Sequence, residues 1–94
     1  MSDARPTVQV DDDRVRVTRW DFEPGATTGR HRHEYPYVVV PVIDGRTQIT
    51  TADGETSYSE LRSGESYARA AGSTHEVVNA GEAALTFVEI ELKG

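Results

Sequence analysis

The sequence predicts an all-β domain, either a β-sandwich or a small β-barrel, and two observations support this. Turn-forming pairs such as Pro24-Gly25 and Asp53-Gly54 recur at short intervals along the chain. Between them lie segments rich in Val, Ile, Thr and Tyr in which polar and apolar residues alternate. Short strands joined by turns at this spacing are typical of sandwiches and barrels, and no segment shows a helical period with capping residues.

Residues 14–22, which read RVRVTRWDF, predict one of these strands. Val15 and Val17 share one face of it. Trp20 and Phe22 take the opposite phase. This change of phase indicates either a β-bulge or a strand covered on both faces. We expect Trp20 to lie in the core rather than at a bound cofactor.

Two further segments predict strands that differ in burial. Residues 37–43, YVVVPVI, are apolar throughout, which indicates a strand buried on both faces. Pro41 cannot donate a hydrogen bond to a neighbouring strand, so it marks an edge or a bulge. Residues 87–92, FVEIEL, alternate, with Glu89 and Glu91 on the face opposite Val, Ile and Leu. This period of two is typical of a half-buried strand.

Length and charge indicate a single domain that does not bind polyanions. The 94 residues are 36% hydrophobic and 28% charged, with a net charge of −6 and arginines that are scattered rather than clustered. This balance argues against binding to nucleic acid or to an anionic membrane. We expect residues 1–6 to form a flexible N-terminal tail and residues 7–94 to form one barrel domain.

The sequence also predicts the setting of the protein. It contains no cysteine, which excludes disulfides, a zinc ribbon and a cysteine nucleophile. It has no apolar stretch like a signal peptide and none near the ~20 residues that span a bilayer, so we expect a cytoplasmic protein. The strand edges of so small a barrel need covering, and we therefore expect a homodimer.

The three histidines of the chain are candidate metal ligands. His31 and His33 are two positions apart, so on an extended segment both side chains project from the same face. Taken alone, such a pair is more often a solvated surface feature than a metal site. His75, in GSTHEVVN, begins another strand-like segment and could supply a third ligand from elsewhere in the fold. Three neutral imidazoles suit Zn, Fe, Cu or Ni rather than Mg or Ca.

Two spaced motifs around these histidines resemble those of the cupin family. The first, G-x5-H-x-H followed by a later glycine, spans Gly25 to Gly45, and the second, G-x5-A-x-G-x2-H-x3-N, spans Gly64 to Asn79. The resemblance implies a small cupin-type β-barrel, the double-stranded β-helix or jelly roll. The stretches HRHEYPYVVVP and FVEIELKG also resemble small single-domain cupins assigned to β-alanine degradation.

The motifs depart from the family pattern at two positions. Ala70 stands where the family has proline, which affects only the rigidity of a turn. The family's metal-binding glutamate is missing, because its position falls on Val38, or on Tyr37 with the shorter spacing. Glu34 follows His33 directly and should point to the opposite face. The resemblance therefore implies a metal bound by His31, His33 and His75 alone.

Three-histidine cupins include iron(II) oxygenases that act on thiols and on β-diketones. The resemblance thus implies a mononuclear Fe(II) dioxygenase that uses O₂, with Zn, Mn, Ni or Cu as alternative metals. A divalent ion held by neutral ligands keeps its full charge, which favours a small anionic, chelating substrate: a β-diketone, a thiol or a carboxylic acid. Zinc with a bound water would instead suggest hydrolysis. The alternative is a non-catalytic cupin that binds or senses a metal or a small ligand.

Four further residues are candidates for contact with the substrate. Tyr67 and Arg69 share one face of a predicted strand, from which Arg69 could pair with a substrate carboxylate. Equally, Arg69 could lie on the surface and Tyr67 could pack in the core. Tyr35 and Tyr37 follow the first two histidines and could cap the pocket, or they could be half-buried strand residues.

Overall fold

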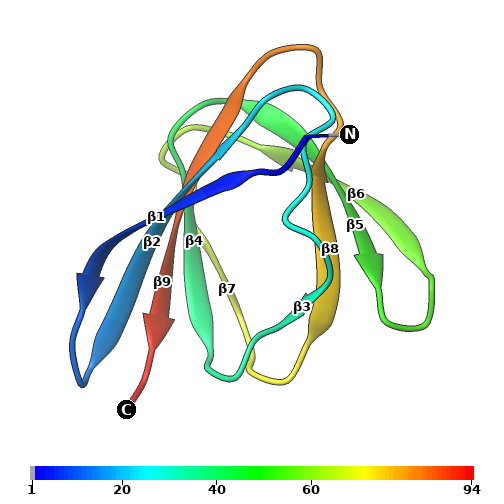
Figure 1. The fold of residues 1–94 in the computed structure, drawn as a ribbon. Helices are drawn as coiled ribbons and strands as arrows, with labels where there is room; N and C mark the ends of the chain where they lie inside the picture. The colour runs from blue at the N-terminus through cyan, green and yellow to red at the C-terminus, as the bar shows by residue number, and fades with distance from the viewer. Residues whose placement is uncertain (1) are drawn as a thin grey trace.

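The computed structural model describes residues 2–94, which form nine β-strands (Figure 1). The two sheets that they build face each other, and the segment that contains β3 crosses between them at their open end. The strands are β1 (Arg5–Asp11), β2 (Val15–Phe22), β3 (His31–Arg32), β4 (Tyr37–Pro41), β5 (Gly45–Thr51), β6 (Thr56–Leu61), β7 (Tyr67–Arg69), β8 (Thr74–Asn79) and β9 (Leu85–Leu92).

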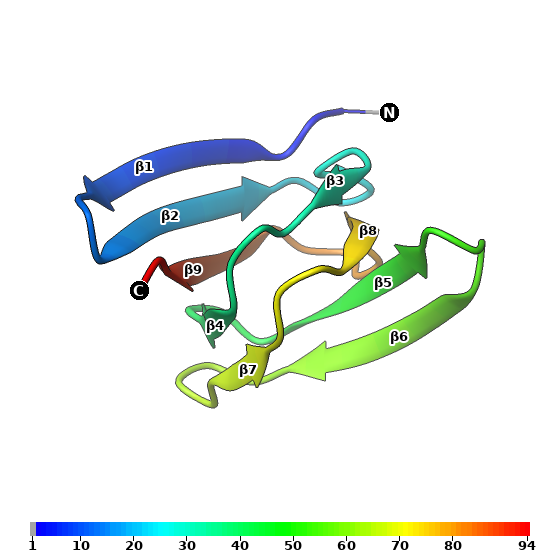
Figure 2. The same ribbon diagram turned by 90° about the horizontal axis from the view of Figure 1, so that it is seen from below.

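One sheet has the strand order β1-β2-β9-β4-β7 and the other the order β3-β8-β5-β6 (Figure 2). All neighbouring strands in both sheets are antiparallel. The all-β prediction is therefore confirmed, and the inner faces of the two sheets enclose one hydrophobic core. That core includes Phe22, Val39, Leu61, Val77, Leu85 and Phe87.

Gly45 is required by close packing at the start of β5. A Cβ atom added at this position would lie 2.5 Å from Cδ1 of Leu85, which is 1% exposed. A larger residue would force this buried side chain to move. The second glycine of the first histidine motif therefore allows β5 to approach β9.

The change of hydrophobic phase in β2 reflects a strand that is at least partly buried on both faces. The pairing of β2 with β9 is unbroken from Val15 to Phe22, so β2 itself carries no bulge. The register shift lies instead in β1, between Val8 and Val10. Trp20 packs against the core from the inner face, as predicted, while the two valines are half-buried on the outer face.

Burial of the segment 37–43 is one-sided, which corrects the prediction. Tyr37 and Val39 are buried in the interior, and Pro41 ends the strand. Val42 and Ile43 lie beyond β4 and are 44% and 43% exposed. A run of apolar residues cannot by itself distinguish a strand covered on two faces from one that continues into an exposed turn.

The predicted tail 1–6 overlaps the first strand, because β1 begins at Arg5. Ala4 is 7% exposed and donates a backbone hydrogen bond to the carbonyl of Thr27 at 2.8 Å, and Thr27 donates one to Ser2 at 3.1 Å. Met1 lies outside the described residues. The segment 2–6 is thus held against the barrel by the same kind of hydrogen bonds as the strands. Within residues 2–94 no helix is long and apolar enough to cross a membrane.

The alternation in β9 is confirmed, and its glutamates occupy the inner face. Phe87, Glu89 and Glu91 are 3%, 7% and 8% exposed. Val88 and Ile90, on the other face, are half-buried. β9 lies at the centre of its sheet, between β2 and β4, so both glutamates project into the barrel.

Candidate metal centre

Backbone pairing brings the three histidines together from two distant segments. His31 in β3 lies directly opposite His75 in β8. His33 follows β3, and its N–H donates to the carbonyl of Ser73 at 2.9 Å while its carbonyl accepts from the N–H of Gly72 at 2.8 Å. The turn before β8 therefore holds the His-x-His segment against the strand that carries the third histidine.

The three imidazole rings converge through their Nε2 atoms. The Nε2 atom of His33 lies 3.0 Å from that of His31 and 3.1 Å from that of His75. The Nδ1 atom of His31 is 3.0 Å from the carbonyl oxygen of Gly29. A carbonyl only accepts, so Nδ1 carries the proton and Nε2 is left with a free lone pair. This is the arrangement in which an imidazole binds a metal ion through Nε2.

Burial lowers the pKa of His33 and of His75 and so keeps these two rings in the neutral form that binds metals. His33 is 5% exposed, and burial, followed by the neighbouring His31, lowers its pKa to about 4. Burial likewise lowers the pKa of His75 to about 4, with further contributions from His31 and His33. At neutral pH these rings therefore need no deprotonation before they accept a cation.

The donor set fits a divalent transition metal. At metal–nitrogen bonds of about 2.1 Å, adjacent ligands are about 3.0 Å apart on an octahedral ion and about 3.4 Å apart on a tetrahedral ion. The observed separations of 3.0 and 3.1 Å are short enough for nitrogen atoms that would bind one such ion. The three histidines are also the group of side chains within residues 2–94 whose ligand atoms all lie within 4.8 Å of one another.

Two aromatic side chains hold the rings in place. The ring of Tyr37 stacks on His33 with centroids 3.9 Å apart, and Trp20 stacks more distantly on His31 at 6.5 Å. Tyr37 is on the inner face of β4, and Val38 is on the other face. Of the two positions at which the family's glutamate could fall, the inward one therefore carries a tyrosine that packs on a histidine.

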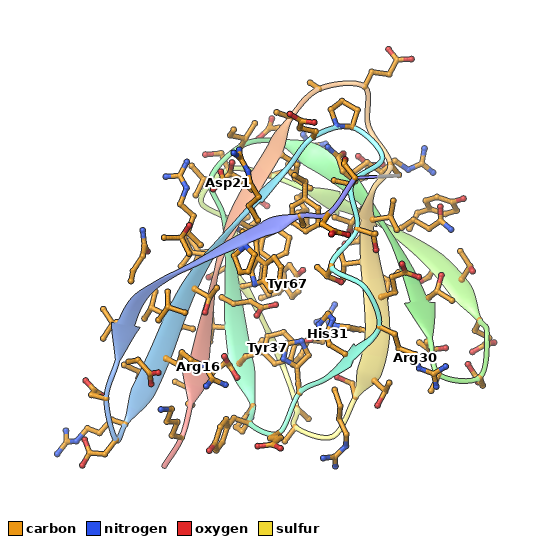
Figure 3. The ribbon with its side chains drawn as sticks, viewed as in Figure 1. Arg16, Asp21, Arg30, His31, Tyr37 and Tyr67 are labelled. Carbon is orange, nitrogen blue, oxygen red and sulfur yellow. The ribbon has the colours of Figure 1, made fainter. Side chains whose placement is uncertain are left out.

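A cavity of about 260 Å³ opens beside His75. Figure 3 shows His31, Tyr37 and Tyr67 in the space between the sheets, whereas Arg30 points away from it. Thr47, which is 2% exposed, has a hydroxyl oxygen without a hydrogen-bond partner among the described residues. The cavity wall combines apolar side chains with this hydroxyl and with charged groups. It includes Val39, Thr47, Ile49, Tyr67, Arg69, Val77 and Phe87.

Of the four residues predicted to contact substrate, three line this cavity. Tyr37 is buried, Tyr67 is half-buried, and Arg69 is exposed at the cavity rim. The guanidinium carbon of Arg69 lies 4.5 Å from the centre of the Tyr67 ring. The sequence left open whether Arg69 lies on the surface or lines the pocket. In the structure it does both, because it is solvent-exposed and also lines the cavity. Tyr35 lines neither this cavity nor the next one.

A second cavity, of about 390 Å³, lies on the other side of the histidines. His31 and His33 line it, whereas His75 lines the first cavity. Pro6 and Val8 of β1 form part of its wall. The histidine cluster is therefore reached from two sides of the barrel.

Sequence reasoning missed Glu89, which lines both cavities. Its Oε2 atom lies 3.8 Å from Nε2 of His33, so a carboxylate that the sequence analysis did not consider lies beside the three histidines. Burial raises the pKa of Glu89 to about 7, against the hydrogen bond from Trp20, which lowers it. One signal was available, because Leu85 and Phe87 share the strand face of Glu89 and mark that face as the buried one.

The chain resembles proteins of one family along nearly its whole length. Residues 18–91 match the sequence model of the cupin domain. The beta-alanine degradation protein BauB of Pseudomonas aeruginosa is 50% identical over 90 residues, which cover 96% of this chain and 94% of that protein.

Solved structures agree with this assignment. A cupin domain from Bordetella pertussis superposes with a TM-score of 0.94 at 46% identity, covering 99% of this chain and 96% of that one. A double-stranded β-helix protein from Klebsiella pneumoniae superposes with a TM-score of 0.79 at 19% identity, covering 98% of this chain and 78% of that one. The second likeness concerns the fold alone.

Proposed function

The chain belongs to the cupin family, and we propose that it is a metal-dependent enzyme acting on a small organic acid. His31, His33 and His75 would hold the metal. The observation that carries this proposal is the convergence of three Nε2 atoms, 3.0 and 3.1 Å from one to the next, at the wall of a 260 Å³ cavity. A cation between the rings would offset the mutual repulsion of their lone pairs.

We propose Fe(II) as the metal and a dioxygenase reaction as the chemistry. Three neutral imidazoles would suit Fe(II), and Mn, Ni, Cu and Zn also accept imidazole. Three protein ligands leave positions for a chelating substrate and O₂. When bound, such a metal supplies a Lewis acid for the substrate and a redox centre for O₂.

The side chains of the first cavity would bind and orient the substrate. Arg69 at the rim would pair with a carboxylate, and the contact of its guanidinium with the Tyr67 ring supports this role. Tyr37 would keep His33 in position and exclude water from one side of the site. The apolar wall suits a short carbon chain.

The name of the Pseudomonas relative suggests a source for this substrate. That protein is named for β-alanine degradation, and the high identity over both whole chains supports a related role here. Transfer of the amino group of a β-amino acid to an oxo-acid acceptor leaves a β-oxo acid, whose enol form is an anionic chelator. We therefore propose a β-oxo acid or a close analogue as the substrate class.

A binding or sensing cupin is the second candidate. The observation that favours it is that the acidic side chains beside the histidines are already engaged, since Glu89 accepts a hydrogen bond from Trp20 and Glu91 accepts two from Arg16. A site with its acidic groups engaged in this way suits reversible ligand binding as well as oxidation.

Metal content tests the site, and turnover separates the two functions. Protein without a histidine tag is purified as wild type, as His75→Ala and as Glu76→Gln. Glu76 is the neighbouring residue, is hydrogen-bonded to Thr27, and serves as the matched control. We expect about one Fe, Mn, Ni, Cu or Zn per wild-type and Glu76→Gln chain, and a loss of most of it in His75→Ala. Equal metal content in all three would contradict the proposed site.

Iron-loaded protein is then mixed with β-oxo acids, β-diketones and mercapto acids while dissolved O₂ is recorded. Consumption of O₂ with one of these classes is expected for the dioxygenase. A flat trace for every compound, with ligand binding detected by calorimetry, would support the sensor instead.

A further inference from the structure

Glu89 on β9 lies in the wall that separates the two cavities, beside the histidine cluster. Its side chain is 7% exposed, and within residues 2–94 it receives a hydrogen bond from Nε1 of Trp20 to Oε1, at 3.3 Å. The other oxygen, Oε2, is 3.8 Å from Nε2 of His33. One carboxylate oxygen is thus held by the indole while the other lies next to the proposed metal.

The position of Glu89 places it just outside the set of direct metal ligands. Two atoms bonded to one ion at about 2.1 Å are at most about 4.2 Å apart. The group of ligand atoms lying within 4.8 Å of one another comprises the three histidines and does not include Glu89. Its carboxylate is therefore placed to contact a molecule bound to the metal rather than the metal itself.

Glu91 provides a comparison on the same face of the same strand. It is 8% exposed and accepts two hydrogen bonds from Arg16, at 2.8 and 3.1 Å, so its charge is paired. Within residues 2–94, no guanidinium donates a hydrogen bond to Glu89, and its hydrogen bond comes from the indole of Trp20 at Oε1. Its Oε2 atom, which faces His33, is therefore left without a hydrogen-bond donor from these residues.

On the basis of the metal site proposed above, we propose that Glu89 selects the ligand that occupies the open positions of the metal. It accepts a hydrogen bond from a ligand that carries an O–H, S–H or N–H beside its metal-binding atom, and it repels anions that have no such hydrogen. A buried acceptor left without a donor costs free energy, which penalises ligands that lack one. The substrate class narrows from any anionic chelator to acids with a hydroxyl, enol or thiol group next to the chelating atoms.

Charge repulsion is tested with azide, an anion without a hydrogen. Co(II) is loaded into wild type, Glu89→Gln and Glu91→Gln at pH 8, and azide is titrated while the visible Co(II) spectrum is recorded. Removal of a negative charge beside the bound anion is expected to tighten azide binding about tenfold in Glu89→Gln. Glu91→Gln should bind azide within about twofold of wild type, since its charge is already paired. Equal azide affinity in Glu89→Gln and wild type would overturn the proposal.

Selection for a hydrogen donor is tested with glycolate and methoxyacetate, which differ in whether the second chelating oxygen carries a hydrogen. Wild type and Glu91→Gln are expected to prefer glycolate by about tenfold, and Glu89→Leu is expected to lose this preference. Thermal denaturation of the metal-free variants verifies that each is folded. A glycolate preference that survives in folded Glu89→Leu would overturn the role of Glu89.

The two proposals fail in different ways. If wild-type protein takes up no Co(II), the metal site is overturned and the role of Glu89 with it. If wild type binds Co(II) but Glu89 variants match it with all three probes, the metal site stands and the role of Glu89 is overturned.

Discussion

The ring of Tyr37 stacks on the imidazole of His33 with centroids 3.9 Å apart and an interplanar angle of 22°. Tyr37 is 3% exposed and comes from β4, whereas His33 precedes that strand in a loop. His33 lies outside the strands, so its ring is not fixed by neighbouring side chains of a sheet. The stacked ring of Tyr37 restrains the imidazole instead. The packing of the core and the geometry of the candidate metal site are therefore coupled through this pair.

Replacement of Tyr37 tests that coupling. Tyr37→Ala removes a buried ring and is expected to lower the free energy of unfolding by about 3 kcal/mol. It should also weaken Co(II) binding about tenfold, because His33 is freed to rotate. Tyr37→Phe keeps the ring and should bind Co(II) like wild type. Chemical denaturation and Co(II) titration measure the two effects, and an alanine variant with wild-type metal affinity would show that the stack has no role in the site.

Arg69 is predicted to increase affinity for carboxylate ligands. In Co(II)-loaded protein, Arg69→Gln should weaken binding of glycolate about tenfold, because a charge-assisted hydrogen bond at the cavity rim is lost. Arg46 is the matched control, since its guanidinium also lies 4.5 Å from a tyrosine ring, that of Tyr58, but lines neither cavity. Arg46→Gln should leave glycolate binding unaltered. Similar losses in both variants would indicate a general effect of protein charge.

The metal-free protein is predicted to lose stability on acidification. The pKa values of His33 and His75 are about 4 in the folded protein and 6.5 without burial, so between these values the unfolded chain binds more protons. The free energy of unfolding therefore falls as the pH is lowered from about 6.5 to about 4. Glu89 contributes to this pH dependence with the opposite sign. Its pKa is raised from 4.5 to about 7 in the folded protein, so the folded state binds more protons than the unfolded chain in nearly the same pH range. Its contribution therefore cancels that of about one histidine.

On acidification the free energy of unfolding is therefore expected to fall by the contribution of one histidine, on the order of 2–3 kcal/mol. Denaturation with urea at a series of pH values, with chelator present, measures it. His75→Gln removes one of the two histidine contributions and should flatten the profile between pH 4.5 and 6.5. A profile in His75→Gln as steep as that of wild type would assign the acid sensitivity to other groups.

Local sequence rules were sufficient for the strands. Turn pairs and period-two alternation predicted an all-β chain, which the structure confirms. That His31 and His33 share a face depends on one extended segment alone. The approach of His75 to this pair was implied by the resemblance to the cupin family, since it depends on two distant segments. The structure brings the three rings together, and the binding of a metal by them stays a prediction.

The tertiary structure alone decided which face of each strand is buried and what lies across from it. Alternation placed Glu89 and Glu91 on one face of β9, but only the pairing of β9 with β2 and β4 turned that face inward. The carboxylate beside His33, the tyrosine stacked on it and the two cavities all follow from contacts between segments far apart in the chain. Alternation of side chains does not reveal which face of a strand turns inward. The sequence therefore determined the histidine nitrogens of this candidate site, and the assembly of the sheets determined which charged side chains lie beside them.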